Sequence, residues 1–245
     1  MPLEPVTAPW PTKIVQVTSK TGTRSFRFFD TEPDRLAVTA VGSRTSYPQY
    51  VLTQPVTSIL DLGANSGIFT VTRAMQYPDA RIVAVEPDPH VFKLLIENTQ
   101  DLPNVSRWQG AVVGDDDPEQ LYIRERCCCT VMSFVTDKPA EENSPDRTFP
   151  ISTLPASQFW DDVLKEPPSI LKMDIEASEG AVLQSLGQER LAKVGVIYLE
   201  YHGAFPRLLA DQMLAPSHLL VAARIITPDQ GELTFIRPDW MPQKA

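Results

Sequence analysis

The stretch that decides the fold runs Ser58-Ile59-Leu60-Asp61-Leu62-Gly63-Ala64-Asn65-Ser66-Gly67-Ile68-Phe69-Thr70. An apolar strand ends near a carboxylate, a tight loop carries two glycines four residues apart, and a helical pattern begins directly after the loop. Glycine tolerates positive φ and lets a ligand approach the backbone without an intervening Cβ atom. We therefore expect a ligand to lie on this loop.

A second apolar strand, Ile82-Val83-Ala84-Val85, leads directly into Glu86. An acid at this place can accept hydrogen bonds from both hydroxyls of a ribose. The glycine loop lacks the G-x-G-x-x-G pattern of dinucleotide sites, and Asp61 would repel a pyrophosphate but attract an ammonium group, directly or through water. The predicted ligand therefore carries a cation and a ribose but no diphosphate. S-adenosylmethionine meets these conditions.

The chain on either side of the loop alternates apolar strands with helical segments. Strands are predicted at 58–62, 81–85, 105–109, 120–124, 170–174 and 196–201, and helices at 67–76, 89–98, 156–164 and 179–186. Continuous apolar strands are typical of parallel sheets that helices cover on both faces. The pattern over 219–226 and 232–236 predicts an antiparallel pair. We predict an α/β fold, a doubly wound and mostly parallel seven-stranded Rossmann-like sheet with an antiparallel C-terminal pair.

The first 55 residues are predicted to form an arm and a lid, and residues 56–245 the main domain. Residues 1–11 are rich in proline and read as an arm, and the alternation over 14–29 predicts a short β-hairpin appendage. If residues 45–50 fold over the ligand, Tyr47 and Tyr50 contact the substrate. Aromatic packing explains these two side chains equally well.

A third motif, Ile170-Leu171-Lys172-Met173-Asp174-Ile175-Glu176-Ala177-Ser178-Glu179-Gly180-Ala181-Val182-Leu183, narrows the interpretation. It resembles the L-K-x-D-x-E-G-x-E-x-x-V-L signature of FkbM-type methyltransferases, and the segments 61–67 and Glu86 resemble the first two motifs of class I S-adenosylmethionine-dependent methyltransferases. The three motifs occur in order over residues 56–201. Ala177 stands where the family usually has glycine, so we expect a stiffer loop there.

The resemblance, together with the strand ends, assigns a set of residues to the cofactor. These are Asp61, Gly63, Ala64, Asn65, Ser66, Gly67, Glu86, Pro87, Asp88, Gln109, Gly110, Ala111 and Asp174. The segment 108–112 is placed at the adenine edge by the resemblance alone. Ligands bind beyond the carboxyl ends of parallel strands, so Asp174 is expected at the methionine end of the cofactor or at the substrate. For Glu179, at a helix start, capping is as good an explanation as function.

The candidate catalytic residues are His202 and Asp174. In methyl transfer from a sulfonium, the protein mainly has to position the acceptor. An alcohol acceptor must also lose a proton, and a histidine that is neutral near pH 7 can accept it. His202 follows the strand 196–201 and is our candidate base. Substrate contacts are expected from Tyr47, Tyr50, Glu176, Glu200 and His202. A carboxylate acceptor would need no base, and His202 would then orient or neutralise it.

The predicted activity is O-methylation of a hydroxyl or carboxylate on a small secondary metabolite or sugar, as the resemblance implies. Three alternatives stay open: N-methylation of a small amine, a nicotinamide-dependent oxidoreductase on a related sheet, and a scaffold that binds the cofactor without catalysis. Cofactor binding by calorimetry separates the second from the others. A scaffold would bind S-adenosylmethionine and methylate nothing.

Composition limits the partners and the location. With 22 Lys and Arg against 31 Asp and Glu the formal net charge is −9, which disfavours nucleic acids and anionic membranes. No run of about 18 apolar residues and no signal-peptide pattern is visible, so we expect a cytoplasmic protein.

Cys127, Cys128 and Cys129 are consecutive, which argues against a disulfide framework, and we expect no metal site. The expected partner is a small-molecule substrate, with a homodimer left open.

Overall fold

A computed structural model describes residues 10–118, 120–126, 129–139 and 147–242. Most of the proline-rich arm predicted at the N-terminus lies outside the described residues. The same is true of Cys127, Cys128 and most of the polar loop that the sequence predicts between residues 138 and 146.

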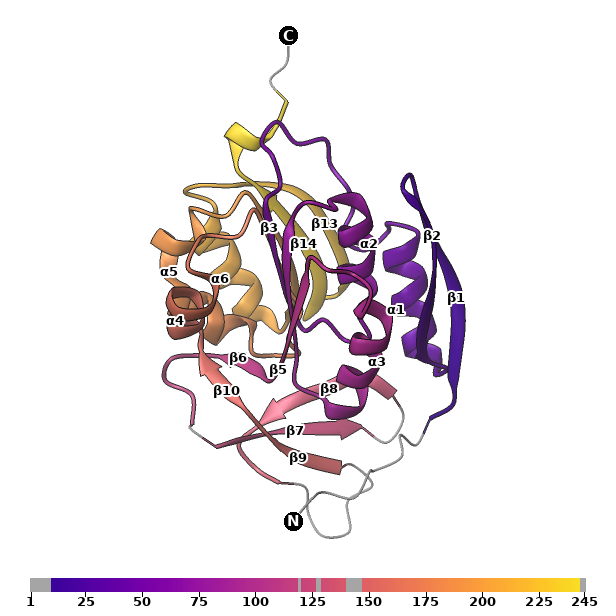
Figure 1. The fold of residues 1–245 in the computed structure, drawn as a ribbon. Coiled ribbons are helices and arrows are strands. Elements are labelled where there is room, and N and C mark those ends of the chain that lie inside the picture. The colour runs from indigo at the N-terminus through magenta and orange to yellow at the C-terminus, as the bar shows by residue number, and fades with distance from the viewer. Residues whose placement is uncertain (1–9, 119, 127–128, 140–146, 243–245) are drawn as a thin grey trace.

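A seven-stranded sheet forms the centre of the molecule (Figure 1). Its strands in chain order are β3 (Ser58–Leu62), β4 (Arg81–Glu86), β5 (Val105–Gln109), β11 (Ile170–Met173), β12 (Val196–His202), β13 (Leu219–Thr227) and β14 (Gln230–Ile236). Their order across the sheet is β13-β14-β12-β11-β3-β4-β5. β14 is antiparallel to β12 and β13, and the other neighbours are parallel. The predicted fold class is confirmed.

The chain leaves the middle of this sheet in both directions, which creates a crevice. It runs from β3 outward to β4 and β5, then returns to β11 on the other side of β3. Ligands bind at such a switch point, beyond the carboxyl ends of the strands. The glycine loop after β3 and the residues after β11 therefore lie at the same edge.

Helices cover both faces of the sheet, as Figure 1 shows. One face carries α2 (Ile68–Gln76) and α3 (Pro89–Thr99), and the other carries α4 (Ala156–Gln158), the π-helix η1 (Phe159–Leu164), α5 (Glu179–Leu191) and α6 (Ala204–Leu214). The alternation of side chains along β3 explains the two layers, because successive residues point to opposite faces. Leu60 and Leu62 join the core under α5 and α6, whereas Ile59 joins the core under α2 and α3.

The N-terminal segment adds a hairpin and a helix outside α2. The hairpin is β1 (Thr12–Ser19) and β2 (Gly22–Phe29), where the sequence predicts it, and Phe26 and Phe28 pack against α2. The helix α1 (Glu32–Gly42) was not predicted. The sequence nevertheless contains two signals for the start of this helix. Thr31 caps it by accepting a hydrogen bond from the Asp34 N–H, and Pro33 lies in its first turn. The division at residue 55 stays a prediction.

Two small sheets lie beside the main one. β6 (Ala111–Val113) pairs in parallel with β10 (Thr153–Pro155). A three-stranded antiparallel sheet is formed by β7 (Leu121–Arg126), β8 (Cys129–Thr136) and β9 (Arg147–Ile151). The strand predicted at 120–124 exists, but its antiparallel partners keep it out of the central sheet.

The remaining differences concern helices. The sequence does not predict α6, and it predicts one α-helix at 156–164, of which residues 159–164 form a π-helix. A short 3₁₀ helix, η2 (Pro238–Trp240), follows β14. None of the helices in the described part of the chain is long and apolar enough to cross a membrane.

Candidate active site

A cavity of about 520 Å³ lies beyond the carboxyl ends of β3, β4, β11 and β12. This volume falls within the range of about 300–1,000 Å³ that is typical of small-molecule sites. The glycine loop and the end of β4 form one half of the wall, which we call the cofactor half. Residues that follow β11 and β12 form the other half, which we call the acceptor half, and α1 and β8 close the outer side.

The glycine loop can take its observed path only because two of its residues lack a side chain. Gly63 has a φ of 73°, and a Cβ atom there would lie 1.7 Å from the carbonyl oxygen of Asp174. Gly67 has a φ of 94°, and its Cβ would lie 2.7 Å from Leu95 Cδ1. Gly63, Ala64, Asn65 and Ser66 all line the cavity.

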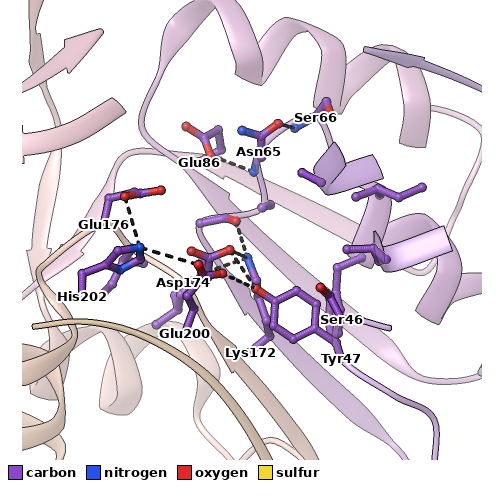
Figure 2. A pocket seen from close by; sticks show the side chains of 18 of the residues that line it. Ser46, Tyr47, Asn65, Ser66, Glu86, Lys172, Asp174, Glu176, Glu200 and His202 are labelled. Atoms are coloured by element: carbon purple, nitrogen blue, oxygen red, sulfur yellow. Dashed lines mark hydrogen bonds and ion pairs between the residues drawn. The ribbon is translucent and has the colours of Figure 1, made fainter. Parts of the chain in front are cut away.

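Glu86 joins the glycine loop to the end of β4. Its carboxylate accepts hydrogen bonds from the backbone N–H groups of Asn65 and Asp88, both at 2.8 Å, while Asn65 Oδ1 accepts from the Ser66 N–H (Figure 2). Burial and the charge of Asp88 raise the pKa of Glu86 to about 8. Glu86, Pro87, Gly110 and Ala111 line the cavity. Their contacts with the cofactor stay predictions.

Asp61 does not lie where we expected it. It is fully buried, accepts a hydrogen bond from Thr70 Oγ1 at 2.6 Å and forms an ion pair with Lys172 Nζ at 3.4 Å. Alternation along β3 turns its side chain into the sheet layer under α2 rather than toward the cavity. The prediction that it attracts an ammonium group of the ligand is therefore corrected, because its charge is already engaged inside the protein.

Three other predicted residues lie outside the cavity wall. Asp88 is buried and caps α3, where it accepts from the N–H groups of His90 and Val91. Gln109 is exposed at the end of β5, and its side chain is absent from the described wall of the cavity. Tyr50 packs against the core under α2 and faces a separate hollow. The structure thus offers no cavity contact for these three side chains.

A buried lysine that we did not assign links the two halves. Lys172 is 3% exposed, lies 3.2 Å from Asp174 Oδ2 and donates to the Gly63 carbonyl at 2.5 Å. Burial lowers its pKa, but the charges of Asp174 and Asp61 outweigh this and raise the pKa above its ordinary value. A charged residue inside the apolar strand Ile170–Met173 was the available signal. Lys172 therefore holds the glycine loop and Asp174 together.

Tyr47 belongs to the cavity wall and is held firmly there. Its ring packs edge-on against Phe69 and Tyr198. Its hydroxyl lies 2.9 Å from Asp174 Oδ2 and 3.3 Å from Glu200 Oε2, so it shares its proton between two carboxylates (Figure 2). Only 6% of the residue is exposed. A substrate contact of Tyr47 stays a prediction, and the observed role is to position Asp174 and Glu200.

His202 lies among carboxylates. Its Nδ1 is 3.0 Å from Glu179 Oε1, and its Nε2 is 3.4 Å from Glu176 Oε2 and 3.7 Å from Glu200 Oε1. Burial alone would lower the pKa of His202, but the hydrogen bond with Glu179 and the charge of Glu176 raise it to about 9. At neutral pH the ring is therefore an imidazolium. A protonated ring suits the orienting or neutralising role considered for His202 better than that of a base, and its catalytic role stays a prediction.

Glu179 has a structural task in the loop that precedes α5, and its functional role stays a prediction. It is fully buried at the start of α5, and its Oε1 accepts from the N–H groups of Ile175 and Ala177 as well as contacting His202. The carboxylate thus shapes the loop after β11 and fixes the orientation of the imidazole ring. Such a buried partner is what keeps a histidine in one tautomer and position.

The loop between β11 and α5 is strained. Glu176 and Ala177 have φ values of 50° and 79°, so two consecutive residues with side chains adopt left-handed backbone conformations. Each costs about 1–2 kcal/mol for a residue other than glycine. The loop that Ala177 was expected to stiffen therefore keeps a backbone that suits glycine. Its effect is to direct Glu176 into the cavity.

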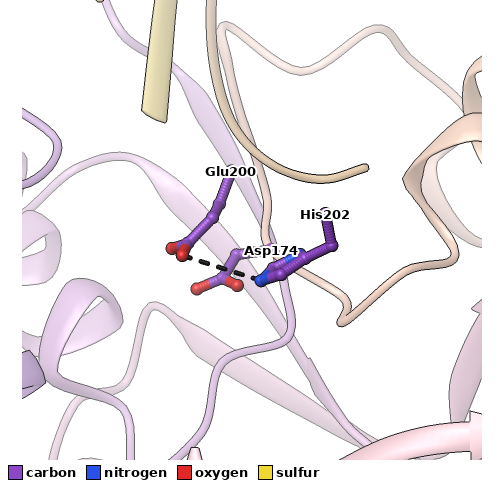
Figure 3. A group of neighbouring side chains, drawn as sticks. All are labelled: Asp174, Glu200 and His202. Carbon is purple, nitrogen blue, oxygen red and sulfur yellow. Dashed lines mark ion pairs between the residues drawn. The ribbon is translucent and has the colours of Figure 1, made fainter. Parts of the chain in front are cut away.

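Two carboxyl groups of the acceptor half titrate near neutral pH. Burial and the charge of Asp174 raise the pKa of Glu176 to about 8 and that of Glu200 to about 7. Asp174, Glu200 and His202 also offer ligand atoms that all lie within 4.8 Å of one another (Figure 3). A small cation can bridge such a group. Our prediction that the site holds no metal stays a prediction.

The sheet order, the glycine loop and the acid at the end of β4 define a Rossmann-like fold of the class I methyltransferase type. Residues 61–216 match the family model described as the methyltransferase FkbM domain. The chain therefore belongs to the FkbM methyltransferase family, and its cofactor is S-adenosylmethionine. The nicotinamide-dependent oxidoreductase that we considered is excluded by this membership.

Similar proteins include a curated relative and several solved structures. A protein named Methyltransferase 1, from Beauveria bassiana, is 26% identical over 200 residues, which cover 75% of this chain and 76% of that protein. The fibrillarin pre-rRNA processing protein of Methanococcus jannaschii has a TM-score of 0.48 and 12% identity over 92% of this chain and 82% of its own. A precorrin-6y C5,15-methyltransferase from Geobacter metallireducens has a TM-score of 0.45 and 12% identity over 85% and 92%.

Proposed function

We propose that the protein methylates a hydroxyl oxygen of a small metabolite. The observation that carries this proposal is the acceptor half of the cavity, where Glu200 faces the ligand space with a pKa of about 7. A hydroxyl must lose a proton when it is methylated, and a base is most effective when its pKa lies near the working pH. Glu200 therefore replaces His202 as our candidate base.

The described residues fit S-adenosylmethionine in the cofactor half. Residues 63–66 line the cavity, and Gly63 packs so closely on Asp174 that a Cβ atom there would strike the Asp174 carbonyl oxygen. Glu86 stands at the cavity with a carboxyl group that suits the ribose hydroxyls. When bound, the cofactor supplies an electrophilic methyl group, and the chain's own residues position the acceptor and exclude water.

The residues around Glu200 have positioning tasks in this proposal. The Tyr47 hydroxyl and the Gln230 amide donate to the two oxygens of Glu200, at 3.3 and 3.1 Å, and so fix the carboxylate toward the cavity. The imidazolium of His202 offsets part of the surrounding negative charge. A carboxylate acceptor is disfavoured, because it would enter beside Asp174, Glu176 and Glu200.

A methyl-donor assay against pooled alcohols, carboxylic acids and amines, read as a mass increase of the products, tests the proposal. We expect methylated alcohols, with the methyl group on oxygen. In the Glu200→Gln variant we expect turnover to fall by about 10²-fold or more while cofactor affinity is unchanged. The rate of the native enzyme should rise with pH through about 7, because the base works in its deprotonated form.

The matched control is Glu189→Gln, which removes a carboxylate that is 90% exposed on α5. This variant should keep the native rate and pH profile. Cofactor binding without any methylated product would favour the scaffold alternative and overturn the proposal. Products methylated only on nitrogen would do the same in favour of an amine acceptor.

A further inference from the structure

The acceptor half holds more negative than positive charge. Within the described residues, the carboxylates that line this half or pair with its cations are Asp61, Asp174, Glu176, Glu179, Glu200 and Glu232, and the cationic groups are Lys172, His202 and Arg224. Even with His202 protonated, three carboxylates are in excess. Burial makes this excess costly, because charges removed from water are weakly screened.

Each cation already has a close carboxylate partner. Lys172 lies between Asp174 at 3.2 Å and Asp61 at 3.4 Å, His202 pairs with Glu179 at 3.0 Å, and Arg224 pairs with Glu232 at 2.8 Å. Asp174, Glu176 and Glu200 must share the same three cations, and all three line the cavity. Their side chains are 24%, 30% and 16% exposed, so they face the ligand space rather than bulk solvent.

The cofactor offsets only part of this excess. S-adenosylmethionine carries a sulfonium, an ammonium and a carboxylate group, which leaves one net positive charge. With the cofactor bound, full ionisation of these groups would leave an excess of about two negative charges, and the raised pKa values of Glu176 and Glu200 reflect the cost of that ionisation without a further cation. A further positive charge on the other ligand of the cavity would therefore be stabilised there.

The outer wall of the cavity has the opposite character. It is formed by apolar side chains of three separate elements: Leu36 and Ala37 of α1, Phe134 and Val135 of β8, and Ile226 of β13. Leu36 is 64% exposed and Ile226 46% exposed. A ligand with an apolar body would cover this surface and gain about 25 cal/mol for each square ångström removed from water. The cavity thus joins an acidic inner end to an apolar outer wall.

We infer that the acceptor of the proposed methyl transfer is amphipathic and carries a positively charged nitrogen group close to its reacting hydroxyl. The charged group lies among Asp174, Glu176 and Glu200, and the apolar body lies along α1, β8 and Ile226. This inference rests on the proposed function and specifies its substrate class. The hydroxyl loses its proton to Glu200, and its oxygen would bond to the methyl carbon as the bond from that carbon to the sulfonium sulfur breaks, which leaves S-adenosylhomocysteine as a neutral thioether. The charged nitrogen takes no part in these bond changes.

Three acceptors that share one apolar chain and one hydroxyl test the inference. The first carries a trimethylammonium group beside the hydroxyl, the second a tert-butyl group of the same shape, and the third a carboxylate. A quaternary nitrogen cannot be methylated, so any product of the first acceptor is methylated on oxygen. We expect kcat/KM for the cationic alcohol to exceed that of its tert-butyl counterpart by about tenfold or more, with the carboxylate lowest.

The Glu176→Gln variant checks that the preference comes from this cluster. It should reduce the ratio between the cationic and the neutral acceptor by about tenfold, whereas Glu189→Gln should leave the ratio unchanged. Dissociation constants of the three compounds, measured by calorimetry with S-adenosylhomocysteine present, should show the same order. This binding measurement keeps the inference testable even where a variant is inactive.

The outcomes separate the inference from the proposed function. If the neutral alcohol is methylated on oxygen as well as the cationic one, the inference fails and the proposed function stands. If no alcohol is methylated, the proposed function fails, and the binding order still decides whether the cavity prefers a cation. A rate that depends on added Mg²⁺ and is abolished by a chelator, without any preference for cationic acceptors, would assign the negative charge to a metal ion and overturn the inference.

Discussion

The two halves of the cavity are built in different ways. The cofactor half is mainly backbone from one short stretch, the loop 63–67, supported by one carboxyl group, Glu86. The acceptor half consists of charged side chains that come from β11, β12 and β14, held by Tyr47 and Lys172. The first half therefore depends mainly on shape and the second mainly on charge, although the pKa of Glu86 in the first half is also raised, to about 8. A steric change at the glycine loop should act chiefly on the first half.

The largest effect should follow from a side chain added to the cofactor half. In Gly63→Ala the new Cβ would lie 1.7 Å from the Asp174 carbonyl oxygen, so the loop must move away from β11. We expect cofactor affinity to fall by about 100-fold or more, which is about 2.7 kcal/mol. Calorimetric titration with S-adenosylmethionine measures this, and circular dichroism confirms that the variant is folded.

Gly42→Ala is the matched control, because an added Cβ at Gly42 meets nothing within 4 Å and its φ is not in the left-handed region. Its cofactor affinity should equal that of the native protein. A Gly63→Ala variant that binds the cofactor within threefold of native would show that the loop adapts, and that shape does not govern this half.

A change of pH should act on the acceptor half. Glu176 and Glu200 titrate at about 8 and about 7 in the folded chain against 4.5 as the ordinary value, and His202 at about 9 against 6.5. The folded chain thus binds more protons than the unfolded chain over this range, so its stability falls as pH rises. We expect the free energy of unfolding without cofactor to drop by at least about 2 kcal/mol between pH 5.5 and 8.5.

Chemical denaturation at constant ionic strength measures this dependence. The double variant Glu176→Gln and Glu200→Gln should show a shallower decrease, because two of the titrating groups are gone. Stability that stays constant or rises over the same pH range would mean that these carboxyl groups keep ordinary pKa values in the folded protein.

The smallest effect should come from the strained loop that separates the halves. Ala177 has a φ of 79°, a conformation that glycine adopts without steric cost. We expect Ala177→Gly to raise the free energy of unfolding by about 0.5–1 kcal/mol, the relief of strain being partly offset by the flexibility of glycine in the unfolded chain. Thermal and denaturant unfolding of the variant measure the difference.

Ala192→Gly provides the comparison at a residue with a φ of −60°, where alanine is not strained. It should lower stability by about 0.5–1 kcal/mol. If Ala177→Gly and Ala192→Gly both lower the free energy of unfolding, the positive φ of Ala177 does not strain the folded protein.

The same contrast explains what the sequence could predict. The loop 58–70 and Glu86 are local patterns, and the structure has the strand, loop and helix where they were expected. Asp61 was predicted to contact the ligand from its place near the end of β3. Successive side chains of a strand point to opposite faces, and this alternation turns Asp61 into the layer under α2. The helix α1 was not predicted although Thr31 and Pro33 mark its start; of its residues only Asp34 and Val38 are buried, so it has a narrow buried face.

The acceptor half was harder to predict because its properties depend on side chains that are distant in the sequence. His202 is a reasonable base when considered alone, and only the approach of Glu176 and Glu179 changes its charge state. Lys172 was visible as a charge in an apolar strand and Asp174 follows two residues later, but its other partner, Asp61, lies on the neighbouring strand β3. The pairing of strands had to be known before these contacts could be inferred.

The helix α1 has a consequence for how such enzymes diverge. It lies outside residues 61–216, which match the family model, yet Leu36 and Ala37 form part of the cavity wall. On the proposed function, we expect mutations in α1 to change acceptor choice without altering the residues that line the cofactor half. Exchange of this one helix between related enzymes would be an economical route to new acceptors in evolution or in the laboratory.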